Sequence, residues 1–330
     1  MNTSKKILVV GGAGYIGSHM VKKLVRAGFD VVVLDDLSTG HRAALRYGHF
    51  VEGSIADRSL LDDLLANGRF DAVMHFASFI QVGESVSQPA KYYQNNVVNT
   101  LNLLDAMVRH GVGNFVFSST AAIFGEPGSP LIDETRPANP INPYGRSKWM
   151  IEQVLADYEH AYGLHSVCLR YFNAAGADPE GELGERHDPE THLIPLVLQA
   201  ASGRRASIAV FGTDYDTPDG TCVRDYIHVD DLCDAHQLAL KRLWAGEGSG
   251  RFNLGNGNGF SVRQVIEAAG KVTGRPILIR YEPRRPGDPA RLVADARRAR
   301  QVLGWQPKFS SLEKIVADAW VWEQKFPWIA

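Results

Sequence analysis

Cysteine is scarce in this chain of 330 residues, which contains only Cys168, Cys222 and Cys233. Their odd number and the lack of paired ligand spacing argue against a disulfide framework or a zinc site, and they fit a reducing compartment. We therefore expect no metal site. Cys168 lies in an apolar strand, so we interpret it as a core residue.

Long apolar segments and an excess of one charge are also missing. The first residues lead directly into a short strand, and no run is long enough for a signal peptide or a membrane span. The 35 basic and 37 acidic residues give a formal net charge of -2, without an overall bias toward nucleic acid or an anionic membrane. We expect a cytoplasmic protein with neither partner. Its length and 45% hydrophobic content predict two domains, or one large domain with an appended lobe.

What the sequence does contain is a glycine turn between a strand and a helix. The apolar run 7–10 is suited to a buried parallel strand, and Gly11, Gly14 and Gly17 follow it before a helical pattern begins. Such glycines let the backbone approach a pyrophosphate at the helix N-terminus, and the third permits tight helix packing. The spacing is G-x-x-G-x-x-G, which differs from the commoner dinucleotide fingerprint.

An acidic residue stands at the tip of the second predicted strand, 31–34. A carboxylate at Asp35 can accept hydrogen bonds from an adenosine ribose, and it would repel a 2′-phosphate. The turn and Asp35 together predict NAD as the cofactor, in preference to NADP.

Further strands and helices alternate along the first half of the chain. Strands are predicted at 50–51, 72–76 and 115–117, with helices at 60–65 and 92–108, a pattern typical of a doubly wound parallel sheet. The last helix is apolar around much of its circumference, so we expect it to serve a subunit interface as well as the core. Ser118 and Thr120 follow the fifth strand, where the ligand crevice of such sheets lies. A local capping role for the Thr120 hydroxyl is the alternative.

Tyr144 and Lys148 are predicted to share one face of a helix. Asn142 is a suitable cap, Pro143 a suitable first residue, and Gly163 a suitable end. A tyrosine acting as a base near pH 7 must have its pKa lowered by roughly 3 units, about 4 kcal/mol. A cation about 6 Å away supplies roughly 3 kcal/mol of that at a dielectric of about 20. Alone, the pair favours an ordinary surface helix, so a catalytic interpretation depends on the other motifs.

After a sixth strand at 165–172, a stretch rich in glycine, proline and acids leads out of the first domain. We expect a helix at 193–201, strands at 207–211 and 252–254, a helix capped by Ser261, and two final helices. The loop 284–288 carries two arginines, whose guanidinium groups are suited to holding a phosphate.

Seven motifs in order give the chain a close resemblance to a known family over nearly its whole length. They are GGAGYIGSH, HFAS, SSTAAIFG, NPYGRSK, LRYFNAAGA, VRDYIHVDDL and PRRPGD. The chain resembles the UDP-glucose 4-epimerases, which are extended short-chain dehydrogenases/reductases. VRDYIHV and PRRPGD are the segments most characteristic of nucleotide-sugar epimerases.

The resemblance implies an α/β fold: a doubly wound parallel sheet (Rossmann fold) with a smaller C-terminal α/β substrate lobe. Residues 1–172 would form the NAD-binding domain, which also receives the segment around 220–255. Residues 173–219 and 256–330 would form the UDP-sugar-binding lobe. The resemblance also implies a homodimer through a four-helix bundle built by helices 92–108 and 143–161.

It further implies the residues of each site. Thr120, Tyr144 and Lys148 would be catalytic. NAD would contact Gly11, Gly12, Gly14, Tyr15, Ile16, Gly17, Asp35, Asp36, Ser54, Ile55, Phe76, Ala77, Ser78, Asn95, Ser118, Tyr144, Lys148 and Phe172. The UDP-sugar would contact Thr120, Asn173, His192, Leu193, Ala209, Val210, Phe211, Arg224, Arg285, Asp288 and Leu292.

In the implied reaction, UDP-glucose and UDP-galactose interconvert through transient oxidation to a 4-keto sugar by bound NAD, a step of galactose metabolism. The Tyr144 phenolate would remove the 4-hydroxyl proton while hydride passes from C4 to NAD, and hydride would return to the opposite face after the sugar turns. Lys148 would hold the nicotinamide ribose and lower the tyrosine pKa, and Thr120 would bond to the reacting oxygen.

Several positions depart from the best-known bacterial pattern. Ser54 replaces an aspartate near the adenine, Ile80 a lysine near the nicotinamide ribose, His192 an asparagine near the uridine, and Thr120 a serine. None of these changes removes a group that performs proton or hydride chemistry. Leu292 stands where that pattern has a tyrosine beside the sugar, which leaves the sugar preference open.

Three other functions are alternatives to the epimerisation of UDP-glucose. A nucleotide-sugar 4,6-dehydratase needs an acid and a base beside the threonine, whereas Ala121 and Ala122 follow Thr120. An epimerase of UDP-N-acetylhexosamines or UDP-uronates stays open. An NAD-sensing binding protein without turnover would share the fold, but the complete set of Thr120, Tyr144 and Lys148 argues against it.

Overall fold

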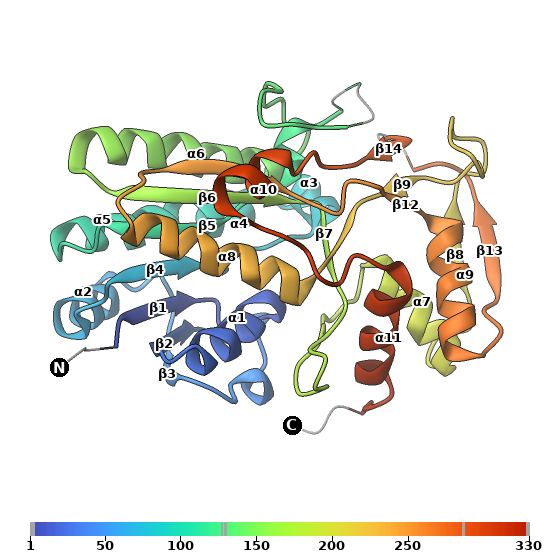
Figure 1. Ribbon diagram of the computed structural model, residues 1–330, viewed down its shortest axis with the longest axis horizontal. Coiled ribbons are helices and arrows are strands. Elements are labelled where there is room, and N and C mark those ends of the chain that lie inside the picture. The colour runs from blue at the N-terminus through green and yellow to red at the C-terminus, as the bar shows by residue number, and fades with distance from the viewer. Residues whose placement is uncertain (1–3, 127, 129–130, 286–287, 328–330) are drawn as a thin grey trace.

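The computed structural model describes residues 4–126, 128, 131–285 and 288–327. Its centre is a seven-stranded parallel sheet in the order β11-β6-β5-β4-β1-β2-β3 (Figure 1). From β1 the strand order runs to β2 and β3 on one side and to β4, β5 and β6 on the other, so the switch point lies between β1 and β4. The strands are β1 (Lys6–Val10), β2 (Asp30–Asp35), β3 (His49–Glu52), β4 (Ala72–His75), β5 (Asn114–Ser118), β6 (His165–Tyr171) and β11 (Gly250–Leu254). This confirms the predicted doubly wound sheet.

Helices cover both faces of this sheet, because alternate strand residues are buried on opposite sides. In β1, Ile7 and Val9 join one core cluster, whereas Leu8 and Val10 join the other. The first cluster is covered by α1 (Tyr15–Arg26), α8 (Val229–Trp244) and α10 (Arg297–Leu303). The second is covered by α2 (Arg58–Gly68), α5 (Asn99–Arg109) and α6 (Pro143–Tyr162). Cys168 is buried in the second cluster, as predicted.

The helix predicted at 92–108 differs in its course. It begins earlier, as α4 (Pro89–Tyr93), passes through a π-helical turn η2 (Gln94–Val98), and continues as α5. The buried Asn96 side chain in that turn donates to the Phe79 carbonyl at 3.0 Å and accepts from the Phe79 amide at 2.9 Å. These two hydrogen bonds attach the wider turn to the segment after β4. π-helical turns occur frequently at functional sites. The short α3 (Val82–Ser87) precedes α4.

A smaller group of elements lies at one end of the sheet (Figure 1). Its core is formed by α7 (Leu193–Ser202), α9 (Val262–Thr273) and α11 (Leu312–Glu323), with the parallel pair β8 (Ile208–Phe211) and β13 (Ile279–Glu282). Ser261 begins α9 with a complete capping box, as the sequence predicted. Two small sheets join this group to the large one: β7 (Asn173–Ala175) with β10 (Tyr226–His228), and β12 (Phe260–Ser261) with β9 (Val223–Arg224) and β14 (Arg291–Leu292).

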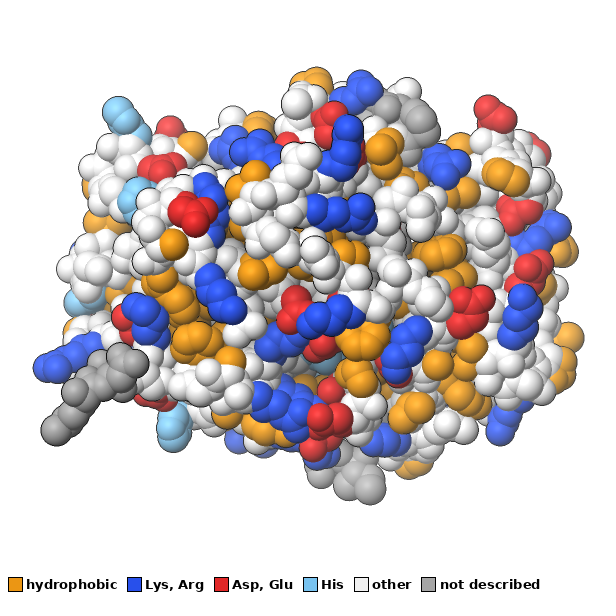
Figure 2. Space-filling view, in the orientation of Figure 1, with side chains coloured by type: hydrophobic (Ala, Val, Ile, Leu, Met, Phe, Trp, Pro, Cys, Tyr) orange, Lys and Arg blue, Asp and Glu red, His pale blue; other side chains and the backbone are white. Residues whose placement is uncertain are grey.

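The surface carries charges of both signs. Basic and acidic side chains are interspersed with apolar ones over the face drawn in Figure 2. Among the described residues, no helix is both long enough and apolar enough to cross a bilayer.

Candidate active site

The glycine turn after β1 brings three backbone segments into close contact. Gly11 has φ +82°, and a Cβ there would lie 2.5 Å from the Ala77 amide nitrogen. A Cβ on Gly17 would lie 2.1 Å from the Gly11 carbonyl oxygen. Only glycine fits either position, so the turn is held tightly against α1 and the end of β4.

Gly14 differs from its two neighbours in the motif. A Cβ at Gly14 would meet nothing closer than the Gly11 carbonyl oxygen at 3.5 Å, so the surrounding protein does not require glycine there. Gly14 also stands at the N-terminus of α1, where no side chain caps the helix. Exposed amides and open space at a helix N-terminus fit an approaching phosphate, which supports NAD as the ligand.

Asp35 ends β2 and faces the same turn. Its Oδ2 accepts from the Ala13 amide at 2.9 Å and its Oδ1 from the Leu37 amide at 2.8 Å. Burial raises the pKa of Asp35, while these two bonds oppose the rise. The carboxylate is thus fixed in orientation, with both oxygens available as acceptors for a ribose.

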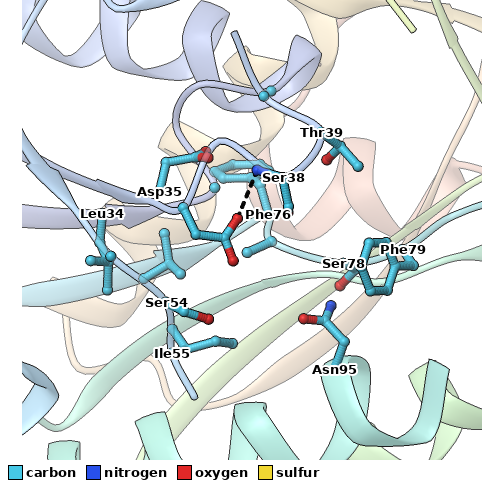
Figure 3. A pocket seen from close by; sticks show the side chains of 17 residues that line it. Leu34, Asp35, Ser38, Thr39, Ser54, Ile55, Phe76, Ser78, Phe79 and Asn95 are labelled. Atoms are coloured by element: carbon cyan, nitrogen blue, oxygen red, sulfur yellow. Dashed lines mark hydrogen bonds between the residues drawn. The ribbon is translucent and has the colours of Figure 1, made fainter. Parts of the chain in front are cut away.

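A cleft with about 530 Å³ of empty space, including space open to solvent, runs along these strand ends (Figure 3). Ten predicted cofactor residues line it: Gly11, Gly14, Asp35, Asp36, Ser54, Ile55, Phe76, Ala77, Ser78 and Asn95. Gly12, Tyr15, Ile16, Gly17, Ser118, Tyr144, Lys148 and Phe172 are not among the lining residues. Tyr15 is turned away because its hydroxyl donates to the Gly176 carbonyl at 2.8 Å, and Ile16 packs into the first core cluster.

Seven residues that line the cleft were not predicted from the sequence. They are Val10, Leu34, Ser38, Thr39, Gly40, Gly53 and Phe79. Each immediately precedes or follows a predicted residue or lies in the loop after β2. The sequence signal that could have identified these residues is their position just beyond the ends of the predicted strands, where ligands of such sheets bind.

The helix that carries Tyr144 and Lys148 forms as predicted. Asn142 Oδ1 accepts from the Gly145 amide at 2.8 Å, Pro143 is the first residue of α6, and Gly163 ends it at φ 70°. These local signals place the two side chains one turn apart on the same face.

Lys148 is buried, and its ammonium group contacts a residue that lines the cleft. Its Nζ donates to Ser78 Oγ at 2.7 Å and to the Ser118 carbonyl at 2.8 Å. Burial lowers the pKa of Lys148 to about 7, which Glu152 partly opposes. Because Ser78 lines the cleft, the ammonium stands at its edge, within the region that a nicotinamide ribose would enter.

The Tyr144 phenol lies near the Thr120 hydroxyl, which favours its ionised form and so opposes the rise of the tyrosine pKa that burial causes. Thr120 also caps the short helix η3 (Ala121–Phe124), since its Oγ1 accepts from the Ala122 amide at 3.1 Å. The local capping role and the partnership with Tyr144 therefore coexist at one hydroxyl.

The expected lowering of the Tyr144 pKa is wrong for the protein without bound ligand. Burial raises the pKa of Tyr144, and only the nearby Thr120 hydroxyl opposes that rise. The reason is that the Lys148 ammonium is directed at Ser78 and Ser118 and not at the phenol.

Two predicted substrate arginines lie near the small sheets and already have partners. Arg224 pairs with Asp288, and the Arg285 guanidinium carbon lies 3.9 Å from the centre of the Phe211 ring. Leu292 is the register partner of Arg224 across β14 and β9. It packs, as Phe172 does, against the cluster of Ala121, Ile123, Phe124 and Ile132, which follows Thr120. Pro286 and Gly287 of the predicted phosphate loop lie outside the described residues.

The other predicted substrate residues lie on neighbouring elements with different roles. Asn173 Nδ2 donates to the Asp225 carbonyl at 2.9 Å, and Leu193 is the first residue of α7. Val210 is buried in the third core cluster, whereas Ala209 is half-buried in the same strand. His192 Nδ1 lies 2.8 Å from Glu185 Oε1, an ion pair that sequence reasoning did not foresee.

Comparison with known proteins agrees with this geometry. Residues 7–255 match the NAD dependent epimerase/dehydratase family. A UDP-glucose 4-epimerase of Halalkalibacterium halodurans is 54% identical over 97% of this chain and 96% of its own length.

Two solved structures share the whole fold. UDP-glucose 4-epimerase from Brucella ovis, in complex with NAD, is 50% identical with a TM-score of 0.94, covering 96% of this chain and 98% of its own. The UDP-Glc/GlcNAc 4-epimerase of Campylobacter jejuni is 46% identical with a TM-score of 0.87, covering 98% and 100%. With its glycine turn, its doubly wound sheet and its Tyr144–Lys148 helix, the chain belongs to the NAD-dependent epimerase/dehydratase family.

Proposed function

We propose that this protein interconverts UDP-glucose and UDP-galactose by inverting C4 of the hexose. The observation that carries the proposal is the placement of Tyr144 and Lys148 one turn apart on α6, with Thr120 near the phenol and Lys148 at the edge of the dinucleotide cleft. Relatives named for this activity align over nearly the whole chain at 50–54% identity.

NAD is the cofactor that the cleft fits. The Gly14 turn would receive the pyrophosphate, Asp35 the adenosine ribose, and Ser78 with Lys148 the nicotinamide ribose. NAD, when bound, supplies a hydride acceptor that takes hydrogen from C4 and returns it. Every proton in the cycle is then handled by side chains of this chain.

Tyr144 is the general base and acid of the proposed mechanism. Its phenolate takes the proton of the 4-hydroxyl group when the sugar is oxidised to the 4-keto form, and the resulting phenol gives that proton back when the sugar is reduced. Thr120 bonds to the same oxygen and holds it near the phenol. Because burial raises the tyrosine pKa, the positive charge of oxidised nicotinamide and of Lys148 must offset that rise.

The nucleotide is held apart from the reacting sugar. Arg224 and Arg285 would bind the two phosphates, and Phe211 with the first turn of α7 would contact the uridine. An anchored UDP leaves the hexose free to turn and present its opposite face, which inversion requires.

The protein would also assemble as a homodimer, and its chain would divide into two domains. A homodimer would form through a four-helix bundle of α4–α5 and α6 from each subunit, and the exposed Val98 and Met150 on these helices support it. Residues 1–172 with the segment around 220–255 would form the NAD-binding domain. The packing of Trp305 and α10 against α8 favours assigning 296–305 to that domain too.

One assay separates this function from its alternatives. Purified protein is incubated separately with UDP-galactose, UDP-N-acetylgalactosamine and a UDP-uronate, and the products are resolved by chromatography. We expect UDP-glucose to form fastest. Turnover of the uronate alone would contradict the substrate assignment, and binding of NAD without turnover of any sugar would favour a sensing protein.

A second test concerns retention of the cofactor. An epimerase that releases reduced cofactor in mid-cycle strands its keto sugar, so we expect NAD to stay bound through purification. Acid release followed by chromatography should recover a dinucleotide. Active protein that carries none and depends on added NAD would contradict tight retention.

A further inference from the structure

Four side chains with metal-binding atoms converge in the loop between β7 and α7. Glu185, His187, Glu190 and His192 form the spacing E-x-H-x-x-E-x-H, and their ligand atoms all lie within 4.8 Å of one another. The segment lies beside α11 (Figure 1), where the Trp322 indole donates to the Glu185 carbonyl at 2.9 Å. It stands outside the dinucleotide cleft and does not involve Tyr144 or Lys148, although it includes His192, which the resemblance assigns to the UDP-sugar.

Two of the four distances between nitrogen and oxygen suit a common central ion. His187 Nδ1 lies 3.2 Å from Glu185 Oε1 and 3.6 Å from Glu190 Oε2. His192 Nδ1 lies 2.8 Å from Glu185 Oε1 and 3.1 Å from Glu190 Oε1. Ligands bound at about 2.0–2.2 Å in a tetrahedron stand roughly 3.3–3.6 Å apart. The two distances from His187 are close to such edges, whereas the two from His192 are shorter and lie in the range of a hydrogen bond.

Hydrogen bonding alone does not account for the arrangement. His187 Nδ1 is buried and makes no hydrogen bond, although Glu185 Oε1 is 3.2 Å away. The ring nitrogen therefore lies within 3.6 Å of both carboxylates without forming a hydrogen bond to either. A metal ion between them would give this buried nitrogen a partner.

A second acidic cluster in the same region provides a contrast. Asp178, Glu180 and Glu182 also lie close together, but the Lys22 ammonium stands among them at 2.6, 3.0 and 2.9 Å. That cluster already contains its cation. Glu185 and Glu190 have two imidazoles beside them instead, which are the ligands that zinc-type ions prefer.

An ion has a route to the four ligands. Glu185 and Glu190 both line a cavity with about 330 Å³ of empty space, including space open to solvent. The two carboxylates are only 6% exposed, whereas His187 is 21% and His192 34% exposed, so a bound ion would be covered by protein on the carboxylate side and reached from the histidine side. A full set of four protein ligands is typical of structural metal sites and not of catalytic ones.

We propose that Glu185, His187, Glu190 and His192 bind one structural zinc-type divalent cation. Two imidazoles with two carboxylates favour Zn²⁺ over Mg²⁺ or Ca²⁺, which prefer all-oxygen shells. Sequence reasoning predicted no metal because it considered the cysteines, and this ligand set contains none. The ion would fix the loop that begins α7 at His192 and contacts Tyr15 through His187.

The primary experiment measures metal content. Protein expressed with added zinc and freed of any affinity tag is assayed by plasma mass spectrometry, together with His187→Gln and the control Glu182→Gln. We expect about one zinc per chain in the parent and control, and an affinity at least about tenfold weaker in His187→Gln. A parent without zinc, or a His187→Gln protein that retains it fully, would overturn the proposal.

A second measurement keeps the test decisive if that variant does not fold. Parent protein is stripped with a strong chelator and titrated with Co²⁺, whose visible absorption reports a tetrahedral site, and its Tm is followed with Zn²⁺ or Mg²⁺. We expect the absorption to develop and Zn²⁺ alone to raise Tm. Neither response in the stripped parent would refute the site, and this result is independent of the epimerase assay.

Discussion

The dinucleotide cleft and the proposed UDP-binding side of the molecule are built in opposite ways. In the cleft, backbone amides hold Asp35 and buried groups hold Lys148, so the polar atoms have fixed partners before any ligand arrives. On the proposed UDP-binding side, Arg224 is paired with Asp288, and Arg285 is an exposed side chain lying on a ring. A phosphate must therefore compete for these groups.

The difference matches the two ligands of the proposed reaction. A preformed site loses little entropy on binding and suits a cofactor that stays for many cycles. A site whose arginines exchange carboxylate and ring partners for phosphate suits a substrate that must leave after each one. Mutations in the two regions should consequently separate cofactor retention and turnover from substrate affinity.

The largest effect is expected at Tyr144 on the chemical side. Replacing Tyr144 with Phe removes the proton carrier, so kcat should fall by at least about a hundredfold while NAD stays bound. The matched control is Tyr162→Phe, an exposed tyrosine 60% accessible on the same helix. Steady-state kinetics with a dinucleotide assay check both, and near-normal turnover of Tyr144→Phe would defeat the mechanism.

The next effect concerns the support behind the catalytic helix. Glu152 lies one turn after Lys148, fully buried, and accepts from Arg170 at 2.9 and 2.5 Å and from Ser119 at 2.6 Å. Glu152→Gln leaves the buried Arg170 charge without its counter-ion, so we expect about 3–5 kcal/mol of destabilisation.

Its control is Glu159→Gln on the same helix, where the carboxylate meets His165 in a partly exposed pair. Such pairs contribute less than about 1 kcal/mol, so stability should change little. Urea unfolding of the NAD-bound proteins compares the two variants. Equal losses would show that burial of the Glu152 pair is unimportant.

A smaller effect is expected at Arg285 and is confined to the substrate. Losing a charged hydrogen bond to phosphate costs about 1.5–3 kcal/mol, so Arg285→Ala should raise KM roughly 10- to 150-fold with little change in kcat. NAD retention should be unaffected. Arg284→Ala serves as the control, because Arg284 is directed at Asp214 at 2.7 Å. A loss of NAD from Arg285→Ala would show that cofactor retention and substrate affinity do not depend on separate regions.

Signals local in the sequence predicted the helix α6 and the glycine turn well. The start and end of α6 follow from Asn142, Pro143 and Gly163, and the glycine turn follows from residues within one short segment. Each of these features depends on neighbours in the chain, so a single sequence is sufficient to find it.

Features that depend on distant contacts were not predictable in the same way. The pairing of Glu152 with Arg170, the π-turn at Gln94–Val98, and the direction of the Lys148 ammonium all arise from packing between segments far apart in sequence. The resemblance supplied a role for Lys148, but only the structure showed that its ammonium does not face the phenol.

The last expected effect concerns sugar selection at Leu292. This side chain packs against the segment after Thr120, and its strand is in register with Arg224, so it links the elements that carry the proposed reacting group and the proposed phosphate ligand. Leucine lacks the ring and hydroxyl of tyrosine. We expect the protein to act mainly on UDP-glucose and UDP-galactose, yet to turn over the N-acetylated pair better than a tyrosine-bearing relative. The Campylobacter jejuni protein, 46% identical, is named for both sugar types.

Changing Leu292 to Tyr should therefore cost more on UDP-N-acetylgalactosamine than on UDP-galactose. A few buried carbons in a pocket are worth about 1–3 kcal/mol, or roughly 10- to 200-fold in discrimination. The ratio of kcat/KM for the two sugars is the right measure, because general damage to the enzyme cancels in it. Leu278→Tyr is the control, since Leu278 is 70% exposed, and its ratio should equal that of the parent. If the ratio is also unchanged in Leu292→Tyr, bulk at this position does not select the sugar.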